Sequence, residues 1–155
     1  MNSAPNVRSA GADDAAEVAR LLDAFNREFD EYTPGVETLT ENARRMLERG
    51  EMTILLAGGG PDGIAELRFR SSVWTGELDA YLEELYVAPE RRGEGLGRAL
   101  LEAAMQAARD AGATHIDLGT SEDDVAAIGL YESAGFTNRE GSPDGPRMLY
   151  YERDL

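Results

Sequence analysis

Apolar residues recur along this chain with two different periods, and these periods predict its helices and strands. Residues 13–29 and 96–111 repeat apolar side chains at helical spacing. Residues 52–57, 64–70 and 81–87 are short apolar runs typical of strands, and glycine-rich residues 58–63 fit a hairpin turn between the first two runs. The chain therefore reads, in order, as a strand at 6–9, helices at 13–29 and from about 38, strands at 52–57, 64–70 and 81–87, a helix at 96–111, a strand at 115–118 and a helix at 125–134.

The element ends carry local signals. Thr38 and Glu41 have the spacing of a capping box, which predicts that the second helix starts near Thr38 and ends at Gly50. After the last helix, residues 136–138 and 148–152 are expected to form a terminal hairpin around a Pro-Asp-Gly-Pro turn.

The element order predicts an α/β or α+β fold built on a mixed sheet. At 155 residues the chain has the length of one domain, which buries roughly 70% of the surface of its unfolded chain. No repeat, linker or low-complexity segment interrupts it, so residues 1–155 are expected to form a single domain.

The formal net charge of -15 narrows the classes of partner. Nucleic acids and anionic membrane surfaces attract basic patches, so neither is expected to bind here, whereas cationic ligands are favoured. The chain has no cysteine and one histidine, His115, which argues against disulfides, zinc-thiolate sites and multi-histidine metal sites. No membrane span or export signal is visible, so we expect a cytoplasmic protein without a bound metal.

A basic, glycine-rich turn between the strand at 81–87 and the following helix is the most informative feature. Glycines 93, 95 and 97 let backbone amides crowd together in front of a helix N-terminus, and Arg91, Arg92 and Arg98 add positive charge. The spacing does not fit G-x-G-x-x-G, because the sixth position is Arg98, and a chain without lysine cannot form a Walker loop. The turn is therefore predicted to bind the pyrophosphate of a ligand that neither of these two motifs binds.

The turn Arg92-Gly93-Glu94-Gly95-Leu96-Gly97 resembles the Arg/Gln-x-x-Gly-x-Gly/Ala motif of the GNAT superfamily of acyl-CoA-dependent N-acetyltransferases. Residues 85–89 are similar to the family's fourth strand and its exit, and residues 127–136 to its last helix and the Gly-Phe that follows. The resemblance implies the GNAT fold, with splayed strands at the CoA site, and acetyl-CoA as co-substrate without a metal. Its implied CoA-binding residues are Leu85, Tyr86, Val87, Arg92, Gly93, Glu94, Gly95, Leu96, Gly97, Arg98, Asp124 and Tyr131.

Two of these residues lie in or before the last helix. Tyr131 occupies the position of the family's tyrosine that faces the CoA sulfur, so the resemblance makes it the acid that protonates the leaving thiolate, since a phenol is protonated at pH 7. Packing against Leu130 and Phe136 is the structural alternative. Asp124 stands where many members carry an asparagine that holds the CoA arm. A carboxylate accepts but does not donate at pH 7, so that contact must differ or be lost.

Glu83 and Glu84 interrupt an otherwise apolar strand, where a carboxylate needs a partner or a role. Strand alternation predicts that they point to opposite faces. By resemblance to subfamilies that include aminoglycoside acetyltransferases, Glu84 is the candidate general base. Other subfamilies use the position of Tyr81 or a water relay, and the structural alternative is an ion pair with Arg68 or Arg70.

The expected function is transfer of an acetyl group from acetyl-CoA to a primary amine by direct attack, with a small cationic amine as acceptor. The acidic segment 28–31 lies where this fold usually shapes the acceptor site. Polyamine, aminoglycoside, amino-acid-like and protein N-terminal acceptors stay open, as do other acyl donors and a homodimer. The alternative from another class is a non-catalytic acyl-CoA-binding regulatory module.

Overall fold

The computed structural model describes residues 5–155, and these divide into two compact units, residues 5–118 and Gly119–Leu155. The first unit holds strands β1 (Val7–Ser9), β2 (Thr53–Ala57), β3 (Gly63–Ser71), β4 (Leu78–Val87) and β5 (Ala113–Leu118) and helices α1 (Ala15–Glu28), α2 (Val36–Glu48) and α3 (Leu96–Asp110). Short 3-10 turns precede α1 at Ala12–Asp14 and α3 at Pro89–Arg91. Helix α4 (Val125–Ser133) belongs to the second unit. The prediction that the chain is a single domain stays a prediction.

The strands of the first unit form one mixed sheet in the order β1-β2-β3-β4-β5. β1 to β4 are antiparallel neighbours, and β5 runs parallel to β4 after the crossover through α3. The sequence-based expectation of a mixed sheet is thus confirmed. β4 and β5 each begin earlier than the pattern indicated, because their first residues include polar ones. Asp79 of β4 pairs with β5, and Thr114 lies between two paired residues of β5.

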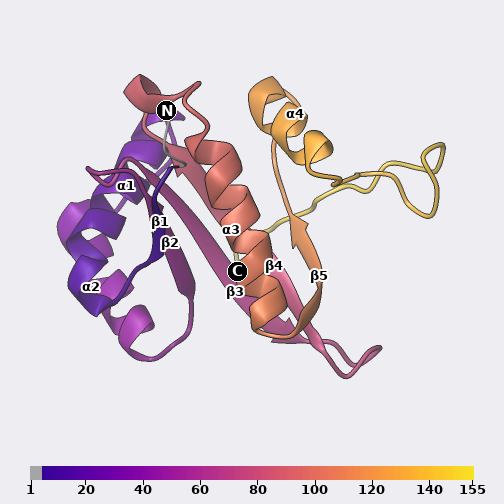
Figure 1. Cartoon of the computed structure of the whole chain (residues 1–155), viewed down its shortest axis with the longest axis horizontal. Helices are drawn as coiled ribbons and strands as arrows, with labels where there is room; N and C mark the ends of the chain where they lie inside the picture. Colours follow the sequence, from indigo (N-terminus) through magenta and orange to yellow (C-terminus); the bar gives the residue numbers. More distant parts are fainter. Residues whose placement is uncertain (1–4) are drawn as a thin grey trace. The chain divides into compact units, whose positions relative to one another are not determined.

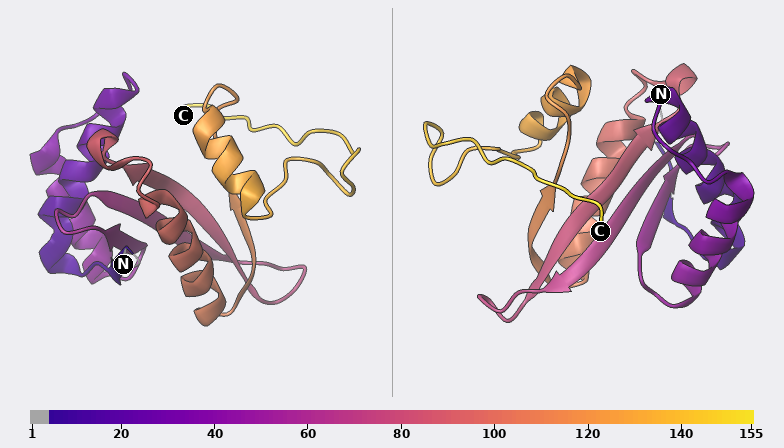
Figure 2. Two further views of the ribbon diagram at one scale, coloured as in Figure 1. Left: turned by 45° about the horizontal axis from the view of Figure 1, so that its top comes forward. Right: turned by 180° about the vertical axis from the view of Figure 1, so that it is seen from behind.

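Helices cover both faces of this sheet (Figure 1, Figure 2). On one face, α1 and α2 pack against a core that includes Val18, Leu21, Ile54, Ile64 and Tyr86. On the other face, α3 brings buried residues such as Leu100 and Leu101 against the strands. α3 approaches β3 closely at Gly63, where an added Cβ would lie 2.9 Å from Leu100 Cδ1, so only a glycine fits without a shift.

The second helix corrects one expectation from the sequence. α2 starts at Val36 with Gly35 as its N-cap, two residues before Thr38, so the capping box of Thr38 and Glu41 is wrong. Gly35 takes a φ of 94°, a left-handed conformation that glycine adopts without steric cost. Gly35 therefore positions the chain for the helix start, and Thr38 lies inside the first turn.

The second unit contains α4 and the C-terminal segment. The predicted terminal hairpin is present only as one antiparallel bridge, Arg139 to Arg147, with the Met148 amide donating to Asn138 O at 2.7 Å. Residues 148–152 form no strand. The prediction of paired strands over residues 136–138 and 148–152 was therefore wrong. Within residues 5–155, no helix is long and apolar enough to cross a bilayer.

Candidate functional site

The turn between β4 and α3 presents free backbone amides. Gly93 and Gly95 have φ values of 80° and 85°, and Gly95 is the N-cap of α3. The backbone amides of residues 93–97 donate to no acceptor within residues 5–155. A helix N-terminus with several amides turned outward suits phosphate oxygens, so this turn fits the diphosphate of a CoA molecule.

The side chains of Arg91 and Arg92 connect the turn to neighbouring elements through hydrogen bonds and ion pairs. Arg91 donates to Glu94 Oε2 at 2.7 Å and to Asp62 Oδ2 at 2.8 Å, which ties the turn to the β2–β3 hairpin. Arg92 donates to Val87 O at 3.0 Å and forms an ion pair with Glu28 of α1 at 2.8 Å. These side chains therefore hold the backbone of the turn in place, and the role of Arg92 in CoA binding stays a prediction.

The strands part beside this turn. The pairing of β4 with β5 stops at Leu82 and Leu118, and β4 continues through residues 83–87 with no described strand on that side. Figure 1 shows the two strands diverging there. The backbone of residues 85–87 is thus open on one edge, as the resemblance implied for the CoA arm. The side chain of Tyr86 points into the core instead, where it packs on Phe25 and donates to Glu28 Oε1 at 3.2 Å.

A β-bulge in β4 lies at the point where the strands part. Glu66 of β3 pairs with Glu84, whereas Leu67 pairs with Leu82, so Glu83 is an extra residue in β4. Arg68 forms ion pairs with both Glu66, at 3.2 Å, and Glu83. The expectation that Glu83 and Glu84 point to opposite faces was therefore wrong, because the extra residue breaks the alternation of the strand.

The bulge gathers three carboxyl groups, and they differ in surroundings. Glu66 is only 5% exposed, and its burial, together with the nearby Glu83 charge, raises its pKa to about 8. Glu84 is half-buried, and burial followed by the Glu83 charge raises its pKa to about 7. Within residues 5–155, the Glu84 carboxylate has no hydrogen bond or ion pair, so the predicted ion pair with an arginine is formed by Glu83 instead.

Glu66 was missed by reasoning from the sequence. It interrupts the apolar run of residues 64–67, which is the same signal that singled out Glu83 and Glu84. Only the register of β3 against β4 shows that it stands opposite Glu84. No group of three or more His, Cys, Asp or Glu side chains within the described chain is arranged to hold a metal ion.

Asp124 and Tyr131 lie in the second unit. Asp124 is the N-cap of α4, and its carboxylate accepts from the Ala127 amide at 3.2 Å. This contact gives the residue a structural role that aspartate fills as well as asparagine. Tyr131 packs edge-to-face on Phe136 with ring centroids 5.9 Å apart, as the structural alternative expected. That contact is compatible with a role for the hydroxyl, which stays a prediction.

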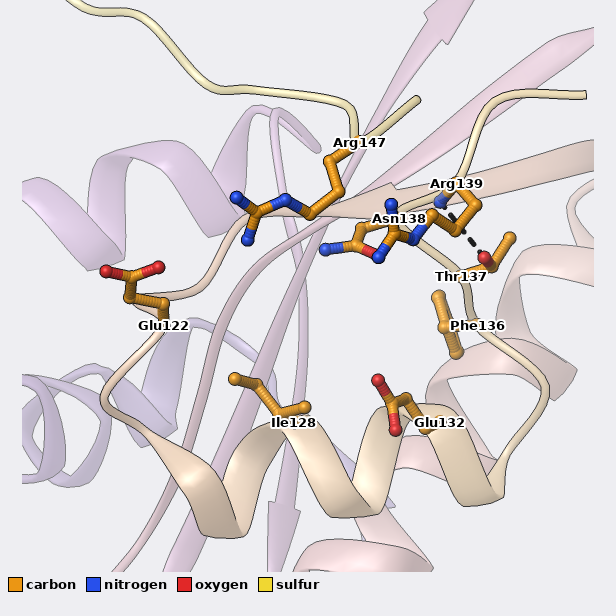
Figure 3. A pocket seen from close by; sticks show the side chains of 8 residues that line it. All are labelled: Glu122, Ile128, Glu132, Phe136, Thr137, Asn138, Arg139 and Arg147. Atoms are coloured by element: carbon orange, nitrogen blue, oxygen red, sulfur yellow. Dashed lines mark hydrogen bonds between the residues drawn. The ribbon is translucent and has the colours of Figure 1, made fainter. Parts of the chain in front are cut away.

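The second unit also has a hollow of about 480 Å³ (Figure 3). Ile128 and Glu132 of α4 point into it, and Arg147 lies across from them. The Arg139 amide donates to Thr137 Oγ1 at 3.0 Å on its rim. None of its lining residues was predicted as a site residue.

Residues 18–136 match the sequence profile described as the acetyltransferase (GNAT) family. The chain belongs to this family. It is 32% identical over 99% of its length to an aminoglycoside N(6')-acetyltransferase type 1 of Stenotrophomonas maltophilia, covering 95% of that protein. It is 29% identical to a thialysine N-epsilon-acetyltransferase of Sus scrofa over 87% of each chain.

A solved structure supports the same assignment. A protein of Arthrobacter sp. FB24 classed as an acetyltransferase is 41% identical, with a TM-score of 0.90 over 100% of this chain and 99% of that one. As a GNAT protein the chain is an acyltransferase that acetylates amines, and the family implies acetyl-CoA as co-substrate. The non-catalytic alternative is thereby set aside.

Proposed function

We propose that this GNAT protein transfers the acetyl group of acetyl-CoA to a primary amine of a small cationic acceptor, with Glu84 as general base and Tyr131 as general acid. The observation that carries the proposal is the half-buried, partner-free carboxyl of Glu84, whose pKa is raised to about 7 by burial and by Glu83. A base with a pKa near the working pH combines a useful ionised fraction with enough basicity to take a proton.

The proposed steps use groups of this chain. Acetyl-CoA, when bound, supplies an acetyl thioester and leaves as the thiol. Glu84 accepts one proton from the acceptor ammonium, and the amine nitrogen then forms a bond to the acetyl carbon as the C–S bond breaks. The Tyr131 hydroxyl gives its proton to the departing sulfur, and the new amide nitrogen loses its second proton to the Tyr131 phenolate, which restores the hydroxyl. Glu84 finally releases its proton to water. The amides of residues 93–97 hold the diphosphate and so orient the thioester.

Two further facts support a cationic acceptor. The net charge of -15 attracts cations in general. The named relatives act on an aminoglycoside and on thialysine, both of which carry amino groups.

Release of CoA thiol in the presence of an amine panel tests the acceptor class. Because the chain has no cysteine, every thiol detected by a disulfide reagent comes from CoA. Diamines, aminoglycosides, amino acids and peptides with a free N-terminus form the panel. The proposal expects the cationic small amines to give the highest kcat/KM, and a preference for peptide N-termini or anionic amines contradicts it.

Glu84→Gln tests the base. We expect kcat to fall by about 10² to 10⁴, with acetyl-CoA affinity unchanged in calorimetry. The fall of kcat/KM as pH drops below about 7, which the proposal attributes to protonation of Glu84, should be absent in this variant. Asp79→Asn on the same strand is the matched control and should keep the parent's kcat. A Glu84→Gln enzyme with the parent's kcat and pH profile overturns this assignment.

A further inference from the structure

Arg68 lies among three carboxyl groups but contacts only two of them. Its guanidinium pairs with Glu66 at 3.2 Å and with Glu83, and it also reaches the sulfur of Met46 in α2 at 3.9 Å. It makes no contact with Glu84 in the structure. Arg68 therefore binds two of the three carboxyls at the bulge and leaves the third, Glu84, without a contact to it.

Glu84 is within the reach of Arg68. Arg68 is two residues from Glu66 on the same face of β3, and Glu66 stands directly opposite Glu84. A diagonal pair of this kind has Cα atoms about 7 to 8 Å apart, which a long side chain can span. A guanidinium released from Glu66 therefore has a nearby alternative partner.

We infer that Glu66 is a positioning residue that, with Glu83, anchors the guanidinium of Arg68 and keeps it away from Glu84. The inference rests on the proposed role of Glu84 as base. A carboxylate paired with arginine is a weaker base and is blocked from a substrate ammonium, so the anchor keeps Glu84 available. Nothing else about Glu66 requires a carboxyl at a site with 5% exposure, where an apolar residue would cost less free energy to bury.

Other charged groups near the cluster have fixed partners. Glu51, before β2, acts on Arg68 from a distance and forms its own ion pair with Arg49 at 3.6 Å. From α1, Glu28 is engaged by Tyr86 and Arg92 further along β4. On β3, Arg70 pairs with Asp117 of β5. Glu83 is thus the charged group that acts on Glu84, and its charge is balanced by Arg68, which Glu66 also holds.

The inference predicts shifts of opposite sign for two variants. In Glu66→Gln, one anchor is lost, Arg68 turns to Glu84, and the pKa of Glu84 falls. In Arg68→Met, the charge of Glu83 is no longer neutralised, and the pKa of Glu84 rises. If Glu66 merely fills space, Glu66→Gln leaves the pKa of Glu84 in place, because glutamine keeps the size and shape of the side chain.

A titration of the whole protein by NMR with carbon-13 in the glutamate carboxyls measures this directly. The Glu84 signal is assigned by its loss in Glu84→Gln. We expect the midpoint in Glu66→Gln to move to lower pH by about one to three pH units, and the acidic limb of kcat/KM to move with it. Glu51→Gln is the matched control and should leave the midpoint unchanged.

The double variant Glu66→Gln/Arg68→Met separates the proposed cause from a general disturbance. With the arginine removed, the midpoint of Glu84 should return to the parent's value or above it. An unchanged midpoint in Glu66→Gln overturns the inference, and so does a midpoint that stays low in the double variant. If Glu66→Gln fails to fold, Arg68→Met is the remaining test. An unchanged titration midpoint of Glu84 in Arg68→Met contradicts the inference.

The titration is independent of turnover. If Glu84→Gln keeps full activity while the midpoint of Glu84 moves as expected, the proposed role of Glu84 fails and the anchoring of Arg68 stands. If Glu84→Gln is inactive and Glu66→Gln shifts nothing, the base stands and the anchor fails. The two results are therefore distinguishable.

Discussion

Glu66 and Glu84 face each other directly across β3 and β4, beside the extra residue that forms the bulge. One of these carboxyls is paired with Arg68 and nearly inaccessible, whereas the other is half-buried and has no partner among residues 5–155. This asymmetry is what makes Glu84 the better candidate for a base. Two carboxyls at neighbouring positions take different states because their surroundings differ.

Gly95→Val should abolish acetyl-CoA binding while the protein stays folded. Gly95 has a φ of 85°, which a β-branched residue adopts only with strain of about 1 to 2 kcal/mol, so the turn should change shape. Gly76→Val is the matched control, because Gly76 has a φ of 72° in the β3–β4 hairpin and also has open space around it. Calorimetry with acetyl-CoA and a thermal melt check both variants. Equal acetyl-CoA affinity in Gly95→Val and the parent would place the diphosphate elsewhere.

Tyr131→Phe should lower kcat by about 10² to 10⁴ with little change in acetyl-CoA affinity or melting temperature. The change keeps the ring that packs on Phe136 and removes only the hydroxyl. Steady-state kcat at saturating acceptor and a thermal melt are the measurements. Undiminished kcat would remove Tyr131 from the mechanism and leave water or another group as the proton source.

The acceptor KM should rise with ionic strength. Attraction between exposed charges is screened over about 8 Å at physiological salt, so a cationic acceptor loses part of its affinity for an acidic protein. An uncharged competitive inhibitor serves as the reference for general salt effects. A KM that is the same at low and high salt argues against a cationic acceptor.

Stability should fall as pH rises because of Glu66. Its pKa is about 8 in the folded protein against 4.5 as the ordinary value, so between these limits the folded state binds more protons than the unfolded state. The contribution of this carboxyl to stability is complete below about pH 4.5 and is lost as pH rises through about 8. Glu84 acts in the same direction as pH rises through about 7, so the comparison of Glu66→Gln with the parent, rather than the pH interval from 7 to 8, isolates Glu66.

Thermal melts across that interval provide the check. The melting temperature of Glu66→Gln should decline less between pH 7 and 8 than that of the parent, whereas Glu51→Gln should follow the parent. A parallel decline in all three proteins would mean that the Glu66 carboxyl does not titrate there.

The helices and the order of strands could be predicted because their signals are local. The apolar periods of residues 13–29 and 96–111, and the glycines of the turn at 92–98, act through backbone conformation and nearest neighbours. The start of α2 was missed because Gly35, with its positive φ, is the N-cap, so the helix begins at Val36, two residues before the competing signal at Thr38.

What the sequence by itself determined is the fold family, the glycine-rich turn before α3 and the presence of carboxyls in an apolar strand. The tertiary structure alone decided which carboxyl is paired. Arg68 belongs to β3 and Glu83 to β4, and their contact depends on a bulge that shifts the register by one residue. Such a shift depends on how the two strands pair with each other, so it leaves no periodic trace in the sequence of either strand.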